Sequence, residues 1–201
     1  MNYDIWNSLS AVAGPNAPLD DTCAPLADRN GSAVSAVKAW KDAGMPNNQI
    51  VLGVPSYGHS FSVAPSAAFE NGSTTTLAAF PVFNASNVPA GDAWSGGVGP
   101  NVCGIQQGFA GIYNFWGLIA EGFLNHDGSA EKDIVYTFDE CSQTVSFPIP
   151  PPVFAIRPGY ILTCLSNVVS PMCTMQALKL WYPSTTRSPS QLKATSSWRM
   201  N

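Results

Sequence analysis

Met1-Asn-Tyr-Asp4 and Gln49-Ile-Val-Leu-Gly-Val-Pro-Ser-Tyr-Gly-His-Ser-Phe61 are the two stretches that decide the fold of this chain of 201 residues. The first predicts a strand over Met1–Trp6. The second contains Ile50–Val54, an apolar run without alternation, which is typical of a parallel strand covered on both faces. The sequence therefore predicts two strands of a parallel sheet, and the segment between them decides the topology.

The connecting segment contains one predicted helix. Its apolar residues recur at helical spacing on one face, at Ala33, Val34, Val37 and Trp40. Asn30 or Ser32 can cap its N-terminus, and Gly44 followed by Pro46 ends it. Two strands joined by a crossover helix make a βαβ unit.

Polar and aromatic side chains follow both predicted strands. Tyr3, Asp4 and Trp6 lie at the end of the first strand, and Tyr57 and His59 follow the second. In parallel α/β folds the carboxyl ends of the strands meet at one edge, where ligands bind. The sequence therefore predicts that these side chains lie on one rim.

The composition excludes several classes of partner. Charged residues make up 11% of the chain, hydrophobic residues make up 45%, and the sequence pI is about 4.9. Nucleic acids and anionic membranes attract basic patches, so this balance favours neither. The apolar content allows one domain with a sizeable core, and no apolar run is long enough to span a bilayer.

The cysteines bear on cofactors and compartment. They are Cys23, Cys103, Cys141, Cys164 and Cys173. They have no CxxC spacing and no neighbouring histidine pairs, so we expect no zinc site, no other metal and no cofactor. A disulfide among the first three cysteines is favoured over three buried thiols and fits an oxidising compartment. Three Asn-x-Ser sequons, at Asn30, Asn71 and Asn84, weakly favour secretion.

The charge distribution divides the chain after residue 144. Residues 1–144 hold all 13 acidic residues and four of the nine basic ones, which gives a net charge of −9. Residues 145–201 hold the other five basic residues and no acidic residue. We therefore expect the two parts to have different origins.

The two opening stretches carry a family resemblance. Met1-Asn-Tyr-Asp4 resembles the Met-x-Tyr-Asp motif on the sixth barrel strand of family 18 glycoside hydrolases, the chitinases. Gly53-Val-Pro-Ser-Tyr-Gly58 resembles the motif that leaves their seventh strand, and Gly14-Pro-Asn-Ala-Pro-Leu19 resembles fungal members. The resemblance covers residues 1–144.

The resemblance implies a division into domains. Residues 1–61 would supply an incomplete TIM (β/α)8 barrel, an α/β fold with strands six and seven and the helix between them. Residues 62–144 would form the α+β insertion domain that chitinases carry after the seventh strand. Two strands of eight cannot close a barrel, so we expect unpaired edges and exposed apolar faces. In the insertion, Trp94 and Trp116 either stack on sugar rings or pack in the core.

The resemblance also implies roles for the rim. In the family the substrate's own N-acetyl group attacks the anomeric carbon while a glutamic acid protonates the glycosidic oxygen. Carried over by position, Tyr3 would hold the N-acetyl group and stabilise the intermediate, Asp4 would hydrogen-bond the acetamido group or sugar hydroxyls, and Met1 would line the pocket floor. Trp6 and Tyr57 either border neighbouring sugar subsites or have structural roles.

The family's acid motif, Asp-x-x-Asp-x-Asp-x-Glu, does not occur in these 201 residues. The resemblance therefore implies an intact chitinase that hydrolyses β-1,4 linkages of N-acetylglucosamine with retention, and a chain that is inactive by itself. A start at Met1, inside the motif, suggests a truncated gene model or an internal start. The alternatives are a noncatalytic protein that binds chitin oligosaccharides and a nonfunctional product. The family implies an extracellular location, with chitin or N-acetylglucosamine oligosaccharides as partner and neither nucleic acid nor membrane.

Residues 145–201 depart from the family pattern, and we expect an unstructured, non-family tail there. Val145-Ser146 can be encoded by GTAAGT, a 5′ splice signal, and Val169-Ser170 can contain the closing AG. The length between them is not a multiple of three, and shifting the frame after Ser170 allows family-like segments in order. We interpret the tail as a retained intron and frameshifted sequence, with a genuine lineage-specific tail as the alternative. Its Pro, Ser and Thr content and lack of periodicity predict no cooperative fold.

Overall fold

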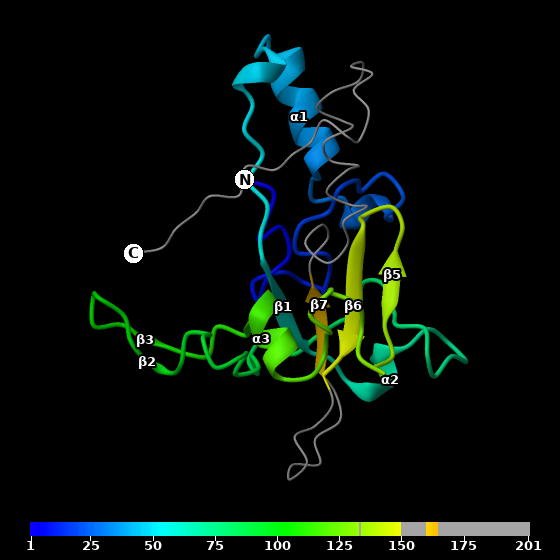
Figure 1. Ribbon diagram of the computed structural model, residues 1–201, viewed down its shortest axis with the longest axis vertical. Helices are drawn as coiled ribbons and strands as arrows, with labels where there is room; N and C mark the ends of the chain where they lie inside the picture. The colour runs from blue at the N-terminus through cyan, green and yellow to red at the C-terminus, as the bar shows by residue number, and fades with distance from the viewer. Residues whose placement is uncertain (133, 150–159, 165–201) are drawn as a thin grey trace.

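The computed structural model describes residues 1–132, 134–149 and 160–164. At its centre is a five-stranded sheet in the order β4-β1-β7-β6-β5, in which every neighbouring pair is antiparallel (Figure 1). The strands of this sheet are β1 Tyr57–Ser62, β4 Ile112–Asn114, β5 Thr137–Asp139, β6 Thr144–Pro148 and β7 Tyr160–Cys164.

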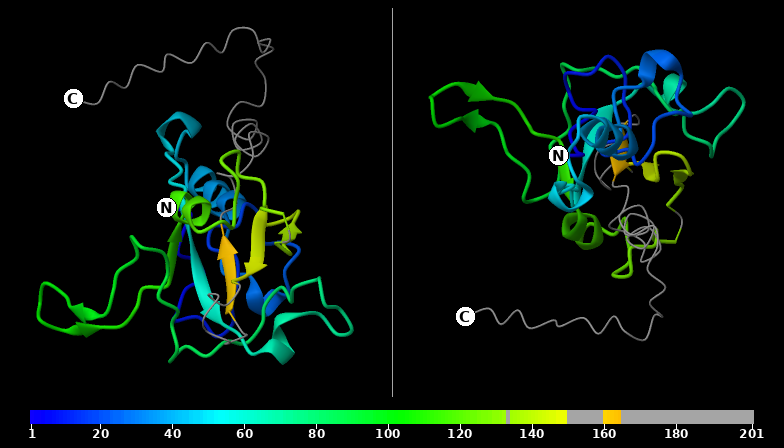
Figure 2. Two further views of the ribbon diagram at one scale, coloured as in Figure 1. Left: turned by 60° about the horizontal axis from the view of Figure 1, so that its bottom comes forward. Right: turned by 90° about the horizontal axis from the view of Figure 1, so that it is seen from above.

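Short helices and one hairpin surround the sheet. The helices are α1 Ala33–Asp42, α2 Pro65–Ala68 and α3 Phe115–Ala120, with 3-10 helices η1 Leu26–Asp28 and η2 Asn47–Gln49. The strands β2 Gly99–Pro100 and β3 Gln106–Gln107 form a hairpin that projects away from the sheet (Figure 2). Within the described ranges, no helix has the length and apolar character needed to cross a membrane.

Two apolar clusters form the core. The first joins α3 and the following turn to β6 and consists of Tyr113, Leu118, Phe123, Leu124 and Phe147. The second joins β1 to α2 and the loops beside it and consists of Ala13, Phe61, Val63, Ala68 and Leu77. Both clusters touch the sheet, so the sheet is the packed part of the molecule.

The helix predicted around residues 33–42 is confirmed as α1. Ser32 caps it: Ser32 Oγ accepts from Ser35 N at 3.3 Å, and Ser35 Oγ accepts from Ser32 N at 2.9 Å. Gly44 ends it with φ +92°, a conformation that glycine adopts without strain. The predicted apolar face is mostly exposed, however, because Trp40 is 56% exposed and Ala33 is the buried residue of the helix.

The prediction of strands over Met1–Trp6 and Ile50–Val54 is wrong, because neither segment is a strand in the described structure. The two segments do lie side by side, since Asn2 N donates to Gly53 O at 2.9 Å. Val51 is nevertheless 87% exposed. Parallel strands occur almost exclusively in sheets whose two faces are both covered, and the exposure of Val51 shows that the described residues do not cover this segment in that way.

The prediction of an unstructured tail is wrong for residues 145–148 and 160–164, which belong to β6 and β7 and complete the sheet. Phe147 is 1% exposed and packs on Phe123, with ring centroids 5.4 Å apart. The physical reason is period-two spacing, because Val145, Phe147 and Ile149 all contact the first core cluster. Residues 150–159 and 165–201 lie outside the described residues, and the retained-intron interpretation stays a prediction.

A disulfide joins Cys23 to Cys141, which lie 118 positions apart. The prediction of a disulfide among the first three cysteines is confirmed. The bond ties the irregular N-terminal segment to the turn between β5 and β6. The third of these cysteines, Cys103, is an exposed thiol near the tip of the β2–β3 hairpin.

Candidate functional site

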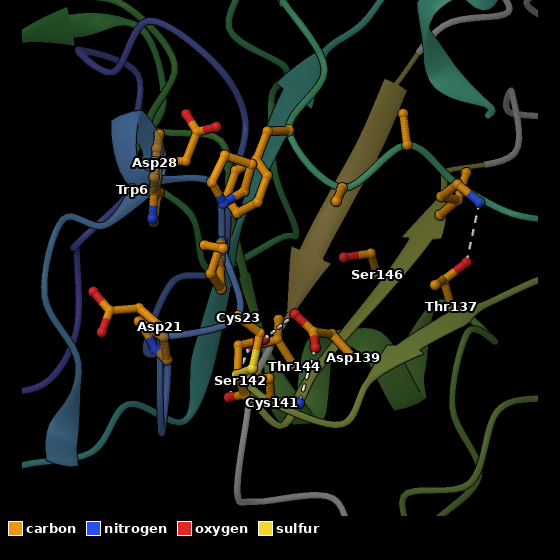
Figure 3. Close-up of a pocket in the computed structure, with 18 of the residues that line it drawn as sticks. Trp6, Asp21, Cys23, Asp28, Thr137, Asp139, Cys141, Ser142, Thr144 and Ser146 are labelled. Atoms are coloured by element: carbon orange, nitrogen blue, oxygen red, sulfur yellow. Dashed lines mark hydrogen bonds between the residues drawn. A yellow bond between two sulfur atoms is a disulfide. The ribbon is translucent and has the colours of Figure 1, made fainter. Parts of the chain in front are cut away.

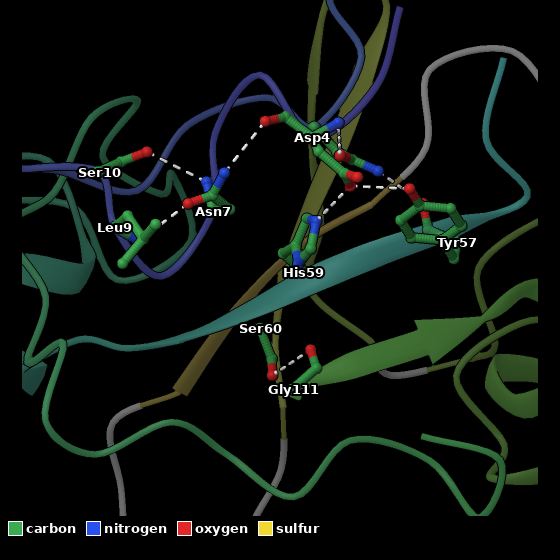
Figure 4. Close-up of polar contacts among 9 residues, drawn as sticks. Asp4, Asn7, Leu9, Ser10, Tyr57, His59, Ser60 and Gly111 are labelled. Atoms are coloured by element: carbon green, nitrogen blue, oxygen red, sulfur yellow. Dashed lines mark hydrogen bonds and ion pairs between the residues drawn. The ribbon is translucent and has the colours of Figure 1, made fainter. Parts of the chain in front are cut away.

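The carboxylate of Asp4 is the centre of a polar cluster at the start of β1. Tyr57 Oη donates to Asp4 Oδ1 at 2.7 Å, and His59 Nε2 lies 2.8 Å from the same oxygen (Figure 4). Because an ionised carboxylate only accepts hydrogen bonds, His59 donates through its Nε2 hydrogen. The Asp4 side chain is 48% exposed and that of His59 is 12% exposed, so the carboxylate can accept a further hydrogen bond from a ligand.

A buried amide, Asn16, fixes the two segments that carry this cluster. Asn16 is 0% exposed, its Oδ1 accepts from Asp4 N at 2.8 Å, and its Nδ2 donates to Tyr57 O at 2.9 Å. Asp4 has φ +60°, a left-handed conformation that costs a residue with a side chain about 1 kcal/mol or more. The hydrogen bond that Asp4 N donates to Asn16 Oδ1 holds Asp4 in that conformation, in which its carboxylate meets Tyr57.

The surroundings of Tyr57 keep its hydroxyl protonated. Burial of the ring, the hydrogen bond to Asp4 and the negative charge of Asp4 raise the pKa of Tyr57 above its ordinary value of 10.0. Tyr57 therefore remains a hydrogen-bond donor at every physiological pH. Its ring also packs edge-on against the ring of His59, with centroids 5.8 Å apart, which fixes the orientation of both donors.

Tyr3 stands beside this cluster. Its ring meets the ring of Tyr57 edge-on, with centroids 6.4 Å apart. Its Cε1 lies so close to Gly53 that a Cβ there would approach it to 3.2 Å, so glycine at position 53 makes room for the tyrosine. Met1 is 89% exposed at the same end of the molecule.

Trp6 lies apart from this cluster. It is 3% exposed, its ring packs on Phe80 with centroids 5.4 Å apart, and a Cβ at Gly14 would come within 2.5 Å of its indole. Of the two sequence alternatives for Trp6, packing accounts for this position. A buried indole has no open face on which a sugar ring can stack.

The rim argument is confirmed for Tyr3, Asp4, Tyr57 and His59, which the structure brings together, and it is wrong for Trp6. Sequence reasoning missed Asn16, because the Gly14–Leu19 segment predicts an irregular loop without a chemical role. A signal was present nonetheless. An asparagine between Pro15 and Ala17 in an apolar, proline-rich stretch is a polar group that needs hydrogen-bond partners once buried.

A separate pocket of about 350 Å³ lies around the disulfide (Figure 3). Its walls include Trp6, Cys23, Cys141 and several carboxylates, among them Asp21 and Asp139. It does not include the Asp4 cluster. Because the Tyr3 and Asp4 side chains that the family resemblance assigns to the sugar lie outside this pocket, we place the candidate site at Asp4.

The described residues do not form a metal centre. Among them, no group of three or more His, Cys, Asp or Glu side chains is placed to hold a metal ion. The cluster at Asp4 combines one carboxylate, two phenols and one imidazole. Such a set suits hydrogen bonding to an uncharged ligand that carries both donors and acceptors.

Comparison with known proteins identifies the family. The model of "Glycosyl hydrolases family 18" matches residues 1–147. The chain belongs to glycosyl hydrolase family 18. A relative from Moniliophthora roreri, described as a chitinase-like effector, is 51% identical over 144 residues, which are 72% of this chain and 35% of that protein. The chain thus spans about a third of the length of this curated relative.

Solved structures of family 18 show the same fold. A chitinase from Rhizomucor miehei superposes with a TM-score of 0.66 at 24% identity, over 90% of this chain and 44% of that chain. A variant of a chitinase from Cycas revoluta, solved in complex with (GlcNAc)4, gives a TM-score of 0.53 at 16% identity, over 90% of this chain and 38% of that chain. At these identities the likeness shows that the chain has the fold of part of a family 18 chitinase.

Proposed function

We propose that this chain supplies one wall of a groove that binds oligomers of N-acetylglucosamine. The main support for this proposal is the Asp4 carboxylate, which is half exposed and is hydrogen-bonded by Tyr57 at 2.7 Å and by His59 at 2.8 Å, with Tyr3 beside it. An acetamido group offers one N–H donor and one carbonyl acceptor. Asp4 can accept from the N–H, and the Tyr3 hydroxyl can donate to the carbonyl.

These roles follow the family's substrate-assisted chemistry. There the acetamido carbonyl of the sugar becomes the nucleophile, so its rotation toward the anomeric carbon must be held. In the intact protein, Tyr3 and Asp4 would hold that group, and Tyr57 and His59 would fix the Asp4 carboxylate. The intact protein would thus hydrolyse β-1,4 linkages of chitin with retention.

For the 201 residues alone we propose binding without hydrolysis. The acid motif Asp-x-x-Asp-x-Asp-x-Glu does not occur in them, and protonation of the leaving oxygen needs an acid placed against it. The second candidate function is a noncatalytic protein that binds chitin oligosaccharides, and the Moniliophthora roreri relative is described as a chitinase-like effector. The Cys23–Cys141 disulfide supports an extracellular location for either function.

Calorimetric titration of the purified 201-residue chain with (GlcNAc)4 tests the binding proposal. We expect saturable binding that weakens at least about tenfold in Tyr3→Phe and in Asp4→Asn, since each removes a hydrogen bond that involves a charged or aligned polar group. Asp42→Asn is the matched control, because Asp42 pairs with Lys38 on the exposed side of α1. Equal affinity in all four proteins would place the sugar elsewhere.

Product analysis of the same mixtures tests the proposed inactivity. Chromatography should show intact (GlcNAc)4 after prolonged incubation, and release of shorter oligomers would overturn that part of the proposal. If the chain neither binds nor hydrolyses (GlcNAc)4, the remaining interpretation is that it is a nonfunctional product.

A further inference from the structure

The chain contains three Asn-x-Ser sequons, at Asn30, Asn71 and Asn84, and all three asparagines are exposed. A sequon is glycosylated only where a transferase can contact both the asparagine amide and the hydroxyl of the serine two positions later. The three serines differ in this respect. The structure therefore separates one sequon from the other two.

In the first two sequons, a local turn engages the serine. Ser32 is 2% exposed, its N donates to Ser35 Oγ at 2.9 Å, and its hydroxyl donates to the same oxygen at 3.0 Å. Ser73 Oγ accepts from Thr75 N at 3.1 Å and from Thr76 N at 2.7 Å. Each bond joins residues two or three positions apart, so it can form in the nascent chain and compete with a transferase.

The third sequon presents its asparagine and its serine together. Asn84 Oδ1 accepts from Ser86 N at 3.1 Å, which bends the sequon into an Asx-turn. Asn84 O accepts from Asn87 N at 3.0 Å, which closes a β-turn. Among the described residues, none hydrogen-bonds Asn84 Nδ2 or Ser86 Oγ. The amide nitrogen and the hydroxyl are therefore both open to a transferase.

This turn is fixed to the end of β1 that lies away from the candidate site. Asn84 N donates to Ser62 O at 2.7 Å, and Asn87 Nδ2 donates to Ser62 Oγ at 3.0 Å. Tyr57 is at the other end of the same strand, about 16 Å away by the rise of an extended chain. A glycan on Asn84 thus begins well away from the Asp4 cluster.

The side of the segment to which Asn84 projects is open. Val82 and Phe83 each form an isolated bridge, so the chain leading to Asn84 is extended and alternate residues project to the same side. Phe83 packs on Phe61, with ring centroids 4.9 Å apart. Val82, on the other side, is 67% exposed. A glycan at Asn84 therefore meets solvent and can cover the Val82 side chain.

We propose that Asn84 is the N-glycosylation site of this chain and that Asn30 and Asn71 stay largely unmodified. This proposal goes beyond the sugar-binding function and does not depend on it. In the reaction, Asn84 Nδ2 forms a bond to C1 of an oligosaccharide carried on a lipid pyrophosphate. The bond from C1 to the pyrophosphate oxygen breaks, the lipid pyrophosphate leaves with its electron pair, and a base of the transferase takes one proton from Nδ2. The Cys23–Cys141 disulfide is consistent with the oxidising lumen in which this transfer takes place.

Site occupancy in the full chain of 201 residues tests this proposal. The chain is expressed in yeast behind a cleavable secretion leader and collected from the medium and from the cell lysate. A peptide N-glycosidase, used in water labelled with heavy oxygen, converts each glycosylated asparagine to a labelled aspartate that peptide mass spectrometry detects. We expect occupancy at Asn84 to exceed that at Asn30 and Asn71 at least about fivefold, the ratio that one competing hydrogen bond of about 1 kcal/mol produces.

Matched variants connect the occupancy to the local hydrogen bonds. Ser86→Ala keeps the asparagine and should abolish labelling at Asn84, whereas Ser86→Thr restores a hydroxyl and should keep it. Ser35→Ala removes the side chain that engages Ser32 N and should raise the occupancy of Asn30 severalfold. Because the transfer acts on the nascent chain, a variant that fails to fold still gives a result.

Two results would overturn the proposal. Unlabelled Asn84 in chains whose leader has been cleaved would show that the sequon entered the lumen and was not used. Equal occupancy at Asn30, Asn71 and Asn84 would show that the local turns do not select among the sequons, and unchanged occupancy of Asn30 in Ser35→Ala would contradict the same selection.

Discussion

The sheet and helix α1 bury their apolar residues to very different extents. In the sheet, Phe61 and Phe147 are each 1% exposed. In α1, Trp40 is 56% exposed, and on the segment that follows the helix Val51 is 87% exposed. Both regions have apolar residues at the correct spacing, so spacing alone does not bury a side chain. The difference is a neighbouring element, which β1 and β6 have and which the exposed side of α1 lacks among the described residues.

Local interactions account for α1 without such a neighbour. The Ser32–Ser35 capping box satisfies its first turn, Lys38 pairs with Asp42 one turn further along, and Gly44 ends it. Helices of this length are marginal in water when they depend on local interactions. We therefore expect α1 to be the weaker region and the sheet to carry the stability of the chain.

Loss of the Cys23–Cys141 disulfide should lower the free energy of unfolding more than any other change proposed here, because the bond ties the irregular N-terminal region to the sheet across 118 positions. In the loop-closure model a bond of this span contributes about 4–5 kcal/mol to the free energy of unfolding. Urea titration of Cys23→Ser followed by tryptophan fluorescence measures the loss. Cys103→Ser, which removes an exposed thiol, should change little. A similar small change in both variants would show that the bond does not stabilise the fold.

Substitutions in the two regions should differ by several kcal/mol. Phe147→Ala removes a buried ring from the first core cluster and should lower the free energy of unfolding by about 3–5 kcal/mol. Trp40→Ala removes an exposed ring and should change it by about 0.5 kcal/mol or less. Thermal unfolding of both variants beside the wild type checks the contrast. Comparable losses would mean that the face of α1 is covered in solution.

The buried amide of Asn16 offers a further test, since it joins the segment of Asp4 to the start of β1 at the candidate site. Asn16→Ala leaves Asp4 N and Tyr57 O without their hydrogen bonds to the Asn16 side chain, which should cost about 1–3 kcal/mol. It should also weaken (GlcNAc)4 binding, because Asp4 loses the contact that holds its left-handed backbone. Asn87→Ala, which removes an exposed amide bonded to Ser62, serves as the control. Unchanged stability and unchanged affinity in Asn16→Ala would contradict the positioning role.

Local signals in the sequence predicted local structure well. The cap at Ser32 and the end at Gly44 both follow from residues within one helical turn. The strands failed where pairing is non-local. Ile50–Val54 has the composition of a buried strand, but a strand exists only in a ladder, and its partners are decided by the whole chain.

The candidate site was likewise predictable only in part. The sequence predicted one rim because polar and aromatic side chains follow two predicted strands. Four of them, Tyr3, Asp4, Tyr57 and His59, do converge, although neither segment forms a strand. Asn16 could not be assigned in the same way. Its role depends on two contacts, to residues 12 and 41 positions away, and no local pattern encodes them.

The smallest predicted effect concerns Glu121, at the C-terminal end of α3. Burial and the nearby Asp92 carboxylate raise the pKa of Glu121, and a negative charge at a helix C-terminus is unfavourable as well. When folding raises the pKa of a carboxyl group, ionisation of that group destabilises the fold. Stability is therefore highest while the group is protonated at low pH, and it falls as the pH rises from the unfolded pKa through the folded pKa. Glu121→Gln should therefore raise the free energy of unfolding slightly at pH 7, by less than about 1 kcal/mol because the side chain is exposed, and leave it unchanged at pH 3, as urea titration at the two pH values would show. Glu140→Gln removes the same charge at another exposed position, so an equal rise in both variants would assign the effect to net charge rather than to the local environment of Glu121 beside Asp92.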